Sequence, residues 1–417
     1  DACGDKNLFP LGSISYARKT PGKLTYAAGI FTQGGMGADF SLNHTLYKDA
    51  SLNFVPQPYH SKFAVVQGGG SLSYQLNKQL AIGATANLVY GQVEFQMPMS
   101  MPPSMLGGVI NPSTGMTFGN LFGGGYESGG LGYTELVASA NMNTLKALGF
   151  NGKIGLAYKP SDKFSLGINY TLPVDLTYKN GKAQMDMTYQ MDNAFGKVVA
   201  GILQQYPNTP LPQAQQMAQG MFANMDIDLT RGASDQYDAE ARFGLPQSIA
   251  AGLFFAPTPK LRLALDGEWI NWEKAFDQMD ITLTGGTNPN INRMMGTQGS
   301  ISMAFPMYWE NTVVIRSGAE YDATRSLTLR AGYAYGSNPV PATTVFPVFP
   351  AIVTDHLTAG ISVKLPRGLV LNGAYEYAFQ NDQKASANSL VADEYNNSTS
   401  SLENHIFHVS LSWLLKK

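Results

Sequence analysis

The sequence predicts an all-β protein, a transmembrane up-and-down antiparallel β-barrel that forms a single domain over residues 1–417. Three observations support this fold class. Apolar and polar residues alternate with a period of two over many segments, as they do in strands with one face in lipid and the other in water. Short polar connections alternate with long ones along the chain. Although 44% of the residues are hydrophobic, no run reaches the roughly 18 apolar residues that a membrane-spanning helix needs.

The alternation is clearest in residues 164–178, where apolar side chains occupy every second position: Phe164, Leu166, Ile168, Tyr170, Leu172, Val174, Leu176 and Tyr178. A strand of about 15 residues is longer than the usual five or six and suits a tilted crossing of a bilayer. The last strand repeats the pattern with Phe407, Val409, Leu411 and Trp413. A soluble β-sandwich would also alternate, so the connections have to distinguish the two architectures.

The connections favour the barrel. Short turns rich in Pro, Asp, Gly and Lys are expected at 19–23, 76–79, 159–163, 256–260, 322–326 and 364–368. Longer connections lie between them, at 34–60, 97–147, 179–245, 273–311, 337–354 and 381–403. Strict alternation of the two kinds is typical of a barrel with periplasmic turns and extracellular loops. The strands are expected near 12–18, 22–33, 61–75, 80–96, 149–158, 163–178, 247–256, 260–272, 312–321, 325–336, 355–365, 368–380 and 404–415.

These ranges give thirteen strands, whereas single-chain bacterial barrels normally have an even number. The first strand runs away from the long-loop side. We therefore expect one N-terminal strand, and whatever precedes it, to be missing from this sequence, and the whole barrel to have fourteen strands. The alternative is a strand hidden within 182–192 or 278–284.

The predicted interior face carries charges of both signs, including Arg262, Asp266, Arg316, Glu320 and Glu376. Fourteen strands would enclose a lumen wider than side chains alone can fill. Mixed charges favour a plugged interior with internal ion pairs over an ion-selective channel, although solvated lumen charges are an equally ordinary interpretation for any one residue.

Two of the long loops are unusually apolar for segments that face water. Methionine adapts to irregular shapes, which suits a site for flexible apolar ligands. We therefore expect these loops to capture hydrophobic molecules, and we keep open that they pack on one another as a cap, since both can be true. The candidate residues are Met97, Met99, Met101, Met105, Phe118, Phe122, Phe346 and Phe349.

A further loop changes its periodicity. Between Met191 and Asp226 the apolar spacing becomes helical, with a proline-rich break at 207–212. This pattern predicts two short amphipathic helices within about 194–225 that form a lid or a purely structural cap.

The second predicted strand runs into Gly34, Gly35, Met36 and Gly37, and Phe40 follows closely. Glycines weaken strand pairing and allow a bulge or a kink. In a barrel wall this segment is a candidate lateral opening. The alternative is an ordinary glycine-rich loop.

Composition and motifs argue against other classes of function. The net charge of −2 and the lack of a basic patch argue against nucleic-acid binding. The single Cys3 excludes an intrachain disulfide and a cysteine-rich metal site. The five histidines have no metal-ligand spacing, and no nucleophile motif is visible. We therefore expect no cofactor, no metal and no enzymatic activity, with a lipase that pairs a serine with His356 or His408 as the remaining alternative.

The chain resembles the FadL/TodX family of outer-membrane transporters for long-chain fatty acids and other hydrophobic molecules. The resemblance covers most of the chain and is carried by diffuse motifs at Leu24–Phe40, Gly70–Glu94, Leu245–Ser248, Trp269–Trp272 and Leu329–Pro341. It implies a fourteen-stranded barrel, an N-terminal hatch that plugs the lumen, and a kink in the third strand. Gly34–Gly37 would fall on that kink, and the hatch and the first strand would be missing here.

The predicted function is passive uptake of hydrophobic molecules, such as long-chain fatty acids, across the bacterial outer membrane. The loops would capture the molecule, the lumen would bind it, and the kink would release it sideways into the bilayer. The predicted partners are a fatty acid, lipid or detergent and the outer-membrane lipids. Two alternatives remain: a structural or secretion-associated barrel whose loops bind a protein partner, and a general porin.

Overall fold

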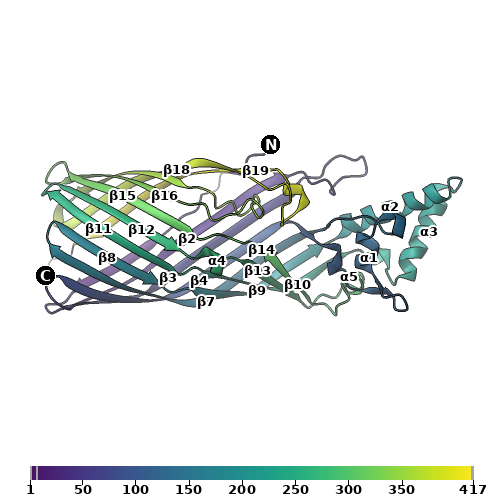
Figure 1. Cartoon of the computed structure of the whole chain (residues 1–417), viewed down its shortest axis with the longest axis horizontal. Coiled ribbons are helices and arrows are strands. Elements are labelled where there is room, and N and C mark those ends of the chain that lie inside the picture. The colour runs from purple at the N-terminus through teal and green to yellow at the C-terminus, as the bar shows by residue number, and fades with distance from the viewer. Residues whose placement is uncertain (1, 6–7, 415–417) are drawn as a thin grey trace.

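The chain forms one large antiparallel β-sheet that curves into a barrel (Figure 1). The computed structural model describes residues 2–5 and 8–414. The sheet contains 17 strands, and four wall strands are interrupted so that each consists of two elements. The wall therefore has thirteen strand positions, and every predicted strand is confirmed.

Nine wall strands are continuous: β1 (Ser13–Lys19), β2 (Leu24–Leu42), β3 (Gln57–Gln75), β4 (Leu80–Met101), β7 (Leu136–Ser161), β16 (Leu327–Gly336), β17 (Asp355–Lys364), β18 (Leu369–Lys384) and β19 (Thr399–Trp413). The interrupted ones are β8 (Phe164–Thr171) with β9 (Val174–Asp186), β10 (Ser234–Leu245) with β11 (Ser248–Thr258), β12 (Leu261–Ile270) with β13 (Gln278–Thr284), and β14 (Ile301–Pro306) with β15 (Thr312–Asp322). A separate small hairpin pairs β5 (Val109–Asn111) with β6 (Met116–Thr117).

One end of the barrel carries the helices α1 (Phe118–Gly123), α2 (Thr188–Gln205), α3 (Leu211–Asn224) and α5 (Pro289–Met295), whereas the short α4 (Trp272–Ala275) lies nearer the middle (Figure 1). The short 3₁₀ turns are η1 (Pro103–Met105), η2 (Tyr126–Ser128), η3 (Leu229–Arg231), η4 (Pro366–Gly368) and η5 (Asp393–Tyr395). Helices α2 and α3 confirm the two helices predicted around the proline-rich break. We call this end of the barrel the loop end, and the opposite end, with the tight connections and the C-terminal strand end, the turn end.

Several predicted loops are shorter than expected, because the strands continue beyond the predicted boundaries at the loop end. Strand β2 extends to Leu42, β4 extends to Met101, and β7 already begins at Leu136. The suspected hidden strand at 278–284 exists as β13. It continues β12 and pairs with β10 and β14, so it lengthens an existing wall position and adds no fourteenth.

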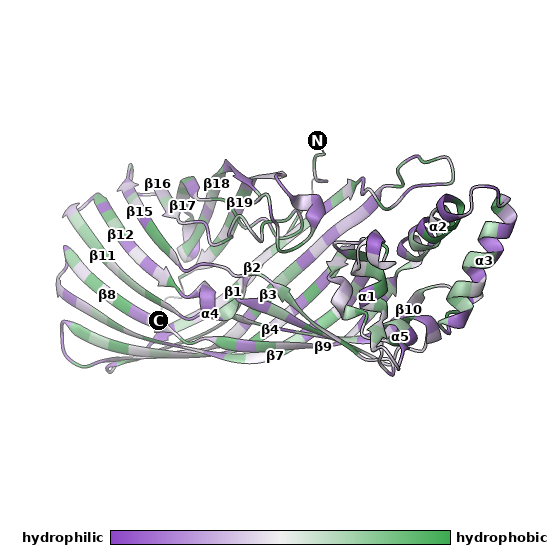
Figure 2. Cartoon of the chain, turned by 45° about the vertical axis from the view of Figure 1, so that its right-hand side comes forward, coloured by the Kyte–Doolittle hydropathy of each residue, from purple (hydrophilic) through white to green (hydrophobic). Residues whose placement is uncertain are grey.

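The wall changes its patterning between its two halves. In the half near the turn end, apolar side chains such as Ile168 and Leu253 are exposed on the outside, at 51% and 38%. In the half near the loop end, Leu176 and Phe243 are buried, at 0% and 8%. The striped strands of the turn half are visible in Figure 2. The prediction that residues 164–178 present one lipid-facing stripe is therefore wrong beyond Leu172.

Proline and irregular backbone produce the change of face. Pro173 separates β8 from β9, and Pro246 separates β10 from β11. The two breaks lie side by side in the sheet, because Thr171 pairs with Ser248 and Val174 pairs with Leu245. Proline cannot donate to the ladder, so it is tolerated where a strand breaks or bulges. The physical reason for the inversion is that apolar residues face hydrocarbon within a bilayer and face the interior beyond it.

The sheet has two edge strands, β1 and β19. Each pairs with one neighbour, β2 and β18 respectively, and no pairing joins β1 to β19 within residues 2–5 and 8–414. The outward side chains of β19 are more exposed than those of inner strands, with Phe407 at 77% and Val409 at 82%. The expected additional strand and hatch concern segments outside this sequence, and they stay predictions.

Candidate functional site

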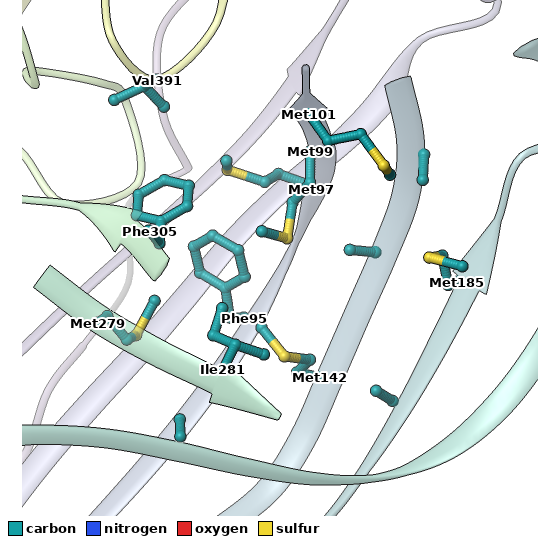
Figure 3. Packing of buried hydrophobic residues seen from close by; sticks show 14 of the residues in the cluster. Phe95, Met97, Met99, Met101, Met142, Met185, Met279, Ile281, Phe305 and Val391 are labelled. Atoms are coloured by element: carbon teal, nitrogen blue, oxygen red, sulfur yellow. The ribbon is translucent and has the colours of Figure 1, made fainter. Parts of the chain in front are cut away.

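The interior of the loop half is a methionine-rich apolar cluster (Figure 3). Strand β4 contributes Phe95, Met97, Met99 and Met101, each at most 6% exposed. The alternation of β4 points these side chains inward, since odd-numbered positions along the strand share one face. The neighbouring strand β7 contributes Met142, which pairs with Phe95, and β9 and β13 contribute Met185 and Met279. The result is a deformable interior, and no Asp, Glu, Lys or Arg residue is buried among the described residues.

The connection between β16 and β17 folds into this interior instead of covering it from outside. Phe346 and Phe349 are 1% and 7% exposed, and the Phe349 ring stacks on Phe95 with centroids 5.9 Å apart. Two hydrogen bonds hold the segment: the Ser61 hydroxyl donates to the Val348 carbonyl, and the Thr344 hydroxyl donates to the Met307 carbonyl at 2.6 Å.

Helix α1 closes the cluster at the loop end. Thr117 caps the helix by accepting from the Asn120 N–H, while the Asn120 side chain accepts from the Thr117 N–H. Phe118 and Phe122 are fully buried, and Met105 packs against the same cluster. All eight predicted capture residues are thus brought together. They belong to one interior cluster formed by strand β4, the β16–β17 connection and the segment around α1. Their contact with a ligand and their role as a cap stay predictions.

An aromatic layer, which the sequence reasoning missed, bounds the cluster on its turn side. It connects Phe63, Phe243, Phe276 and Trp309 through ring-centroid distances of 5.7, 5.2 and 4.7 Å. Tyr178 stacks on Phe243 at 4.5 Å. The signal available in the sequence was the density of aromatic residues next to the strand breaks, where periodicity no longer predicts which way a side chain points.

A glycine makes room for this layer. A Cβ at Gly91 on β4 would lie 2.7 Å from the Tyr178 hydroxyl, which is closer than carbon and oxygen can approach without a shift. Gly91 therefore lets the Tyr178 ring lie against the wall and fill the interior at this level.

Beyond the aromatic layer, the lumen of the turn half is polar. A cavity of about 540 Å³ lies along β3, β4, β7, β8 and β11, with Ser71, Thr85, Lys153 and Asn169 among its lining residues. The predicted ion pairs begin on the neighbouring strand β12, where Asp266 also lines this cavity.

The charged wall is a hydrogen-bonded network. Arg262 on β12 contacts Glu320 and, at 2.8 Å, Asp322, and Arg330 also pairs with Glu320. Arg316 bridges Asp266 at 3.2 Å and Glu268 at 2.9 Å. Separately, Glu376 accepts from His356 at 2.9 Å and lies 3.4 Å from His408. Internal ion pairs are therefore present as expected.

The two edges of the glycine-rich segment Gly34–Gly37 of β2 differ in their backbone hydrogen bonding. The ladder with β3 is continuous through Gly34–Gly37, with a bulge at Gln33. On the other edge, Thr32 donates to Gly12 and Asp39 accepts from Asp5, and the described residues show no backbone hydrogen bond between these two points. Among the described residues, the segment predicted as a kink is a bulge followed by an edge without backbone hydrogen bonds.

Side chains around this edge connect it to the interior. Met36 and Phe40 lie on the inward face of β2 and pack against the methionine-rich cluster. Gly35 and Gly37 lie on the outward face, where Leu11 and Phe9 approach them. The five predicted residues therefore occupy one stretch of wall between the apolar cluster and the outside.

Acidic groups line the loop end of the cluster. Burial raises the pKa of Glu394 to about 7 and also raises the pKa of Glu135. Burial lowers the pKa of His44 to about 4, so its ring is neutral near neutral pH. Two cations also lie at this end of the cluster, Lys197 over the Tyr133 ring at 3.6 Å and Arg293 near the Phe118 ring at 5.5 Å.

No helix in the described part of the chain combines the length and the apolar character required to cross a membrane.

Comparison with known proteins identifies relatives by family model and by fold. The model described as "Outer membrane protein transport protein (OMPP1/FadL/TodX)" matches residues 9–413. Curated protein sequences give no match. The solved structure of the toluene transporter TodX from Pseudomonas putida matches with a TM-score of 0.59 at 19% identity, over 89% of this chain and 77% of that one. A FadL homologue from Pseudomonas aeruginosa matches with a TM-score of 0.62 at 17% identity, over 96% and 77%.

Proposed function

Since the chain belongs to the FadL/TodX family of outer-membrane transport proteins, we propose that it carries uncharged hydrophobic molecules passively across the outer membrane of a bacterium. The methionine-rich interior of the loop half carries this proposal. It is continuous, apolar and adjacent to an unpaired stretch of wall. Related solved structures are described as a toluene transporter and a monoaromatic hydrocarbon channel, which agrees with an apolar cargo.

The charge distribution favours an uncharged cargo over an ionised fatty acid. A carboxylate in an apolar interior needs a positive partner or several donors. No Asp, Glu, Lys or Arg residue is buried among the described residues. The groups beside the buried Tyr395 are Glu394, Glu135 and a neutral His44, and the cations Lys197 and Arg293 contact the rings of Tyr133 and Phe118 instead. A long-chain fatty acid would have to enter protonated, whereas a hydrocarbon would meet no such cost.

The proposed route ends at β2. A molecule released from the cluster next to Met36 and Phe40 would reach the unpaired edge at Gly34–Gly37 and leave sideways into the bilayer. The cluster and the bilayer both remove the apolar surface of the cargo from water, which favours each of them over water by roughly 25 cal/mol per Å², and the molecule moves down its concentration gradient. No energy source is therefore required.

A second candidate function is binding of a protein partner at the loop end. Helix α3 leaves Leu211, Met217 and Met221 between 40% and 53% exposed, and such apolar surface can mark an interaction site. A stoichiometric partner that co-purifies with the native protein, and is lost from a Met217→Lys, Met221→Lys variant, would favour this function.

Binding to the purified barrel tests the main proposal. We expect naphthalene to bind and decanoate at pH 8 to bind at least tenfold more weakly, both measured by isothermal titration. Met97→Gln and Met185→Gln place a polar amide in the cluster and should weaken naphthalene binding roughly tenfold, since an unpaired polar group costs about 1–3 kcal/mol.

The matched control is Met217→Gln, at a methionine that is 40% exposed on α3, and it should bind naphthalene as the unmodified protein does. Equal affinity of all three variants would contradict binding in the methionine-rich cluster. Tighter binding of decanoate than of naphthalene would contradict an uncharged cargo.

A further inference from the structure

The connection between β18 and β19 covers the methionine-rich cluster. Val391, Ala392 and Tyr395 of this segment are buried in the cluster, and Figure 3 includes Val391 among its residues. The Tyr395 hydroxyl lies 3.9 Å from the Met97 sulfur, and its ring centroid lies 6.2 Å from that of Phe346. Residues 385–398 therefore lie between the candidate binding site and the loop end.

Few backbone contacts attach this segment to the rest of the protein. Ser386 and Leu390 donate their N–H groups to the carbonyls of Ala342 and Thr343, both at 2.8 Å. The tip is held by side chains: the Asp393 N–H donates to Glu135 at 2.9 Å. Opening this segment would therefore break few backbone hydrogen bonds, and its cost would come mainly from exposing Val391, Ala392 and Tyr395.

Glu394 makes the central contact at the tip. Its carboxyl group accepts from the Tyr59 hydroxyl at 2.8 Å, and His44 Nε2 lies 3.5 Å from its Oε2 atom. The side chains of His44 and Glu394 are only 3% and 16% exposed. Residues from β3, from the β2–β3 connection and from the β18–β19 connection thus meet at one buried point.

We propose that residues 385–398 form a lid over the methionine-rich cluster and that the buried contact between His44 and Glu394 is its latch. The inference rests on the proposed function in that the cluster is taken to be the binding site, and it adds how access to that site is regulated.

Hydrogen bonding fixes the form of His44 in the closed lid. Its Nδ1 atom accepts from the Leu46 N–H at 3.0 Å, so a neutral ring carries its proton on Nε2, on the side of Glu394. At 3.5 Å from the Glu394 Oε2 atom, Nε2 is buried and makes no hydrogen bond to a described residue.

No base that would balance an ionised Glu394 faces it within the described residues. The titratable groups around it are Tyr59, Tyr47 and Glu135, with Asp393 and Tyr395 from the lid itself. Asp186 and Tyr189 lie beyond Tyr47. The Tyr47 hydroxyl is buried and has no hydrogen-bond partner among these residues. The surroundings favour the protonated carboxyl group.

The two latch residues respond to pH in opposite directions. Burial raises the pKa of Glu394 from 4.5 to about 7, so this group alone would destabilise the closed lid as pH rises from 4.5 to 7. Burial lowers the pKa of His44 from 6.5 to about 4, so this group alone would destabilise the closed lid as pH falls from 6.5 to 4.

The opposing responses cancel between about pH 4.5 and 6.5. In that window the closed lid holds one proton on Glu394, and the open lid holds one on His44, so closing neither takes up nor releases a proton. Burial also raises the pKa of Glu135. Like Glu394, this group therefore destabilises the closed lid as pH rises, and its effect is small. The pH dependences of the two latch residues therefore offset each other. The lid stays closed across a pH range in which either group alone would open it.

Hydrogen–deuterium exchange of the Ser386 and Leu390 amides tests the latch in the full chain in detergent micelles, after correction for intrinsic exchange rates. The unmodified protein should change its closed-to-open ratio less than tenfold between pH 4.5 and 6.5. In Glu394→Gln, the closed-to-open ratio should fall on the order of a hundredfold as pH falls across this window, because only His44 then titrates.

His44→Gln should show the opposite dependence of similar size, because only Glu394 then titrates, and it carries the test if Glu394→Gln does not fold. The double variant should be nearly independent of pH. Glu127→Gln, an exposed acid in η2, should behave as the unmodified protein does. Two flat single variants, or a strongly pH-dependent unmodified protein, would overturn the proposal.

The exchange experiment is carried out without ligand, so its outcome is separable from that of naphthalene binding. Opposite pH dependences in the two single variants without any naphthalene binding would retain the latch and refute the proposed function. Naphthalene binding together with pH-independent exchange in both single variants would refute the latch alone.

Discussion

The ring of Phe63 on β3 lies against that of Phe243 on β10, with centroids 5.7 Å apart, although the two strands do not pair. The contact reaches across the interior at the level where the strands β8–β9 and β10–β11 break. It is the first step of the aromatic layer that continues to Phe276 and Trp309. The layer separates an apolar interior from a polar lumen, so the described barrel is divided along its axis.

Phe243→Ala is expected to breach this layer. The residue is 8% exposed, so the truncation should lower the free energy of unfolding by about 3–5 kcal/mol. It should also speed the swelling of proteoliposomes in arabinose, which we expect to be slow for the unmodified protein. Phe407→Ala, at an outward position that is 77% exposed, serves as the control and should leave swelling unchanged. Rapid swelling of the unmodified protein would instead favour a general porin.

The strands could be predicted from the sequence because alternation and turn residues are local properties. Turns such as Asp322–Ser326 contain the residues that tight connections require. The facing of each strand beyond the bilayer could not be predicted in the same way. Leu172 and Val174 continue one period of two in the sequence, yet Pro173 separates the two strands and reverses the buried face.

The candidate site could be predicted in part. Met97, Met99 and Met101 stood out because apolar residues were crowded where a solvated loop was expected, and they belong to one cluster. Met142, Met185 and Met279 could not be assigned to it, because only the three-dimensional arrangement of distant strands brings them there. The His44–Glu394 contact likewise joins residues 350 positions apart, and no local pattern indicates it.

Gly34→Val is expected to reduce uptake of naphthalene into cells or proteoliposomes at least fivefold without destabilising the barrel. A Cβ at Gly34 meets no atom within 4 Å, so the larger side chain fits, and it would obstruct the inward side of the unpaired edge of β2. Gly37 is a poorer position, since a Cβ there would lie 2.8 Å from the Ser61 carbonyl oxygen.

Gly373→Val on β18 is the matched control, because it also meets no atom within 4 Å and lies on another part of the wall. Unchanged uptake by the Gly34 variant, with its melting temperature also unchanged, would exclude lateral exit at this edge and leave the rest of the proposed function standing.

Arg262→Met is expected to lower the free energy of unfolding by about 2 kcal/mol, measured by reversible urea unfolding in lipid vesicles. The guanidinium holds Glu320 and Asp322 on β15, and hydrogen bonds to charged groups contribute roughly 1.5–3 kcal/mol. Lys163→Met lies at the turn end, where the described residues show no ion pair to its side chain, and it should change the stability by less than 0.5 kcal/mol. Equal effects of the two substitutions would contradict a structural role for the charged wall.

The inversion of the wall predicts where the bilayer ends on β7. Leu148 and Phe150 are 67% and 82% exposed, whereas Lys146, two residues closer to the loop end, is polar and exposed. Spin labels at Leu148→Cys and Phe150→Cys, in a Cys3→Ser background, should be relaxed mainly by oxygen, which concentrates in hydrocarbon. Labels at Lys146→Cys and Lys182→Cys should be relaxed mainly by a water-soluble nickel complex.

Two residues of a strand span about 6.6 Å, which is about the thickness of a lipid headgroup. The agent that mainly relaxes the spin label should therefore change from oxygen to the nickel complex between positions 148 and 146. If the label at Lys146 were as accessible to oxygen as that at Leu148, the bilayer would extend over the loop half. The charged outer face there, including Lys179 and Lys182, would then have to lie in hydrocarbon at a cost of roughly 2–4 kcal/mol for each charge near the midplane. The inverted pattern avoids that cost, which is why we place the boundary between Leu148 and Lys146.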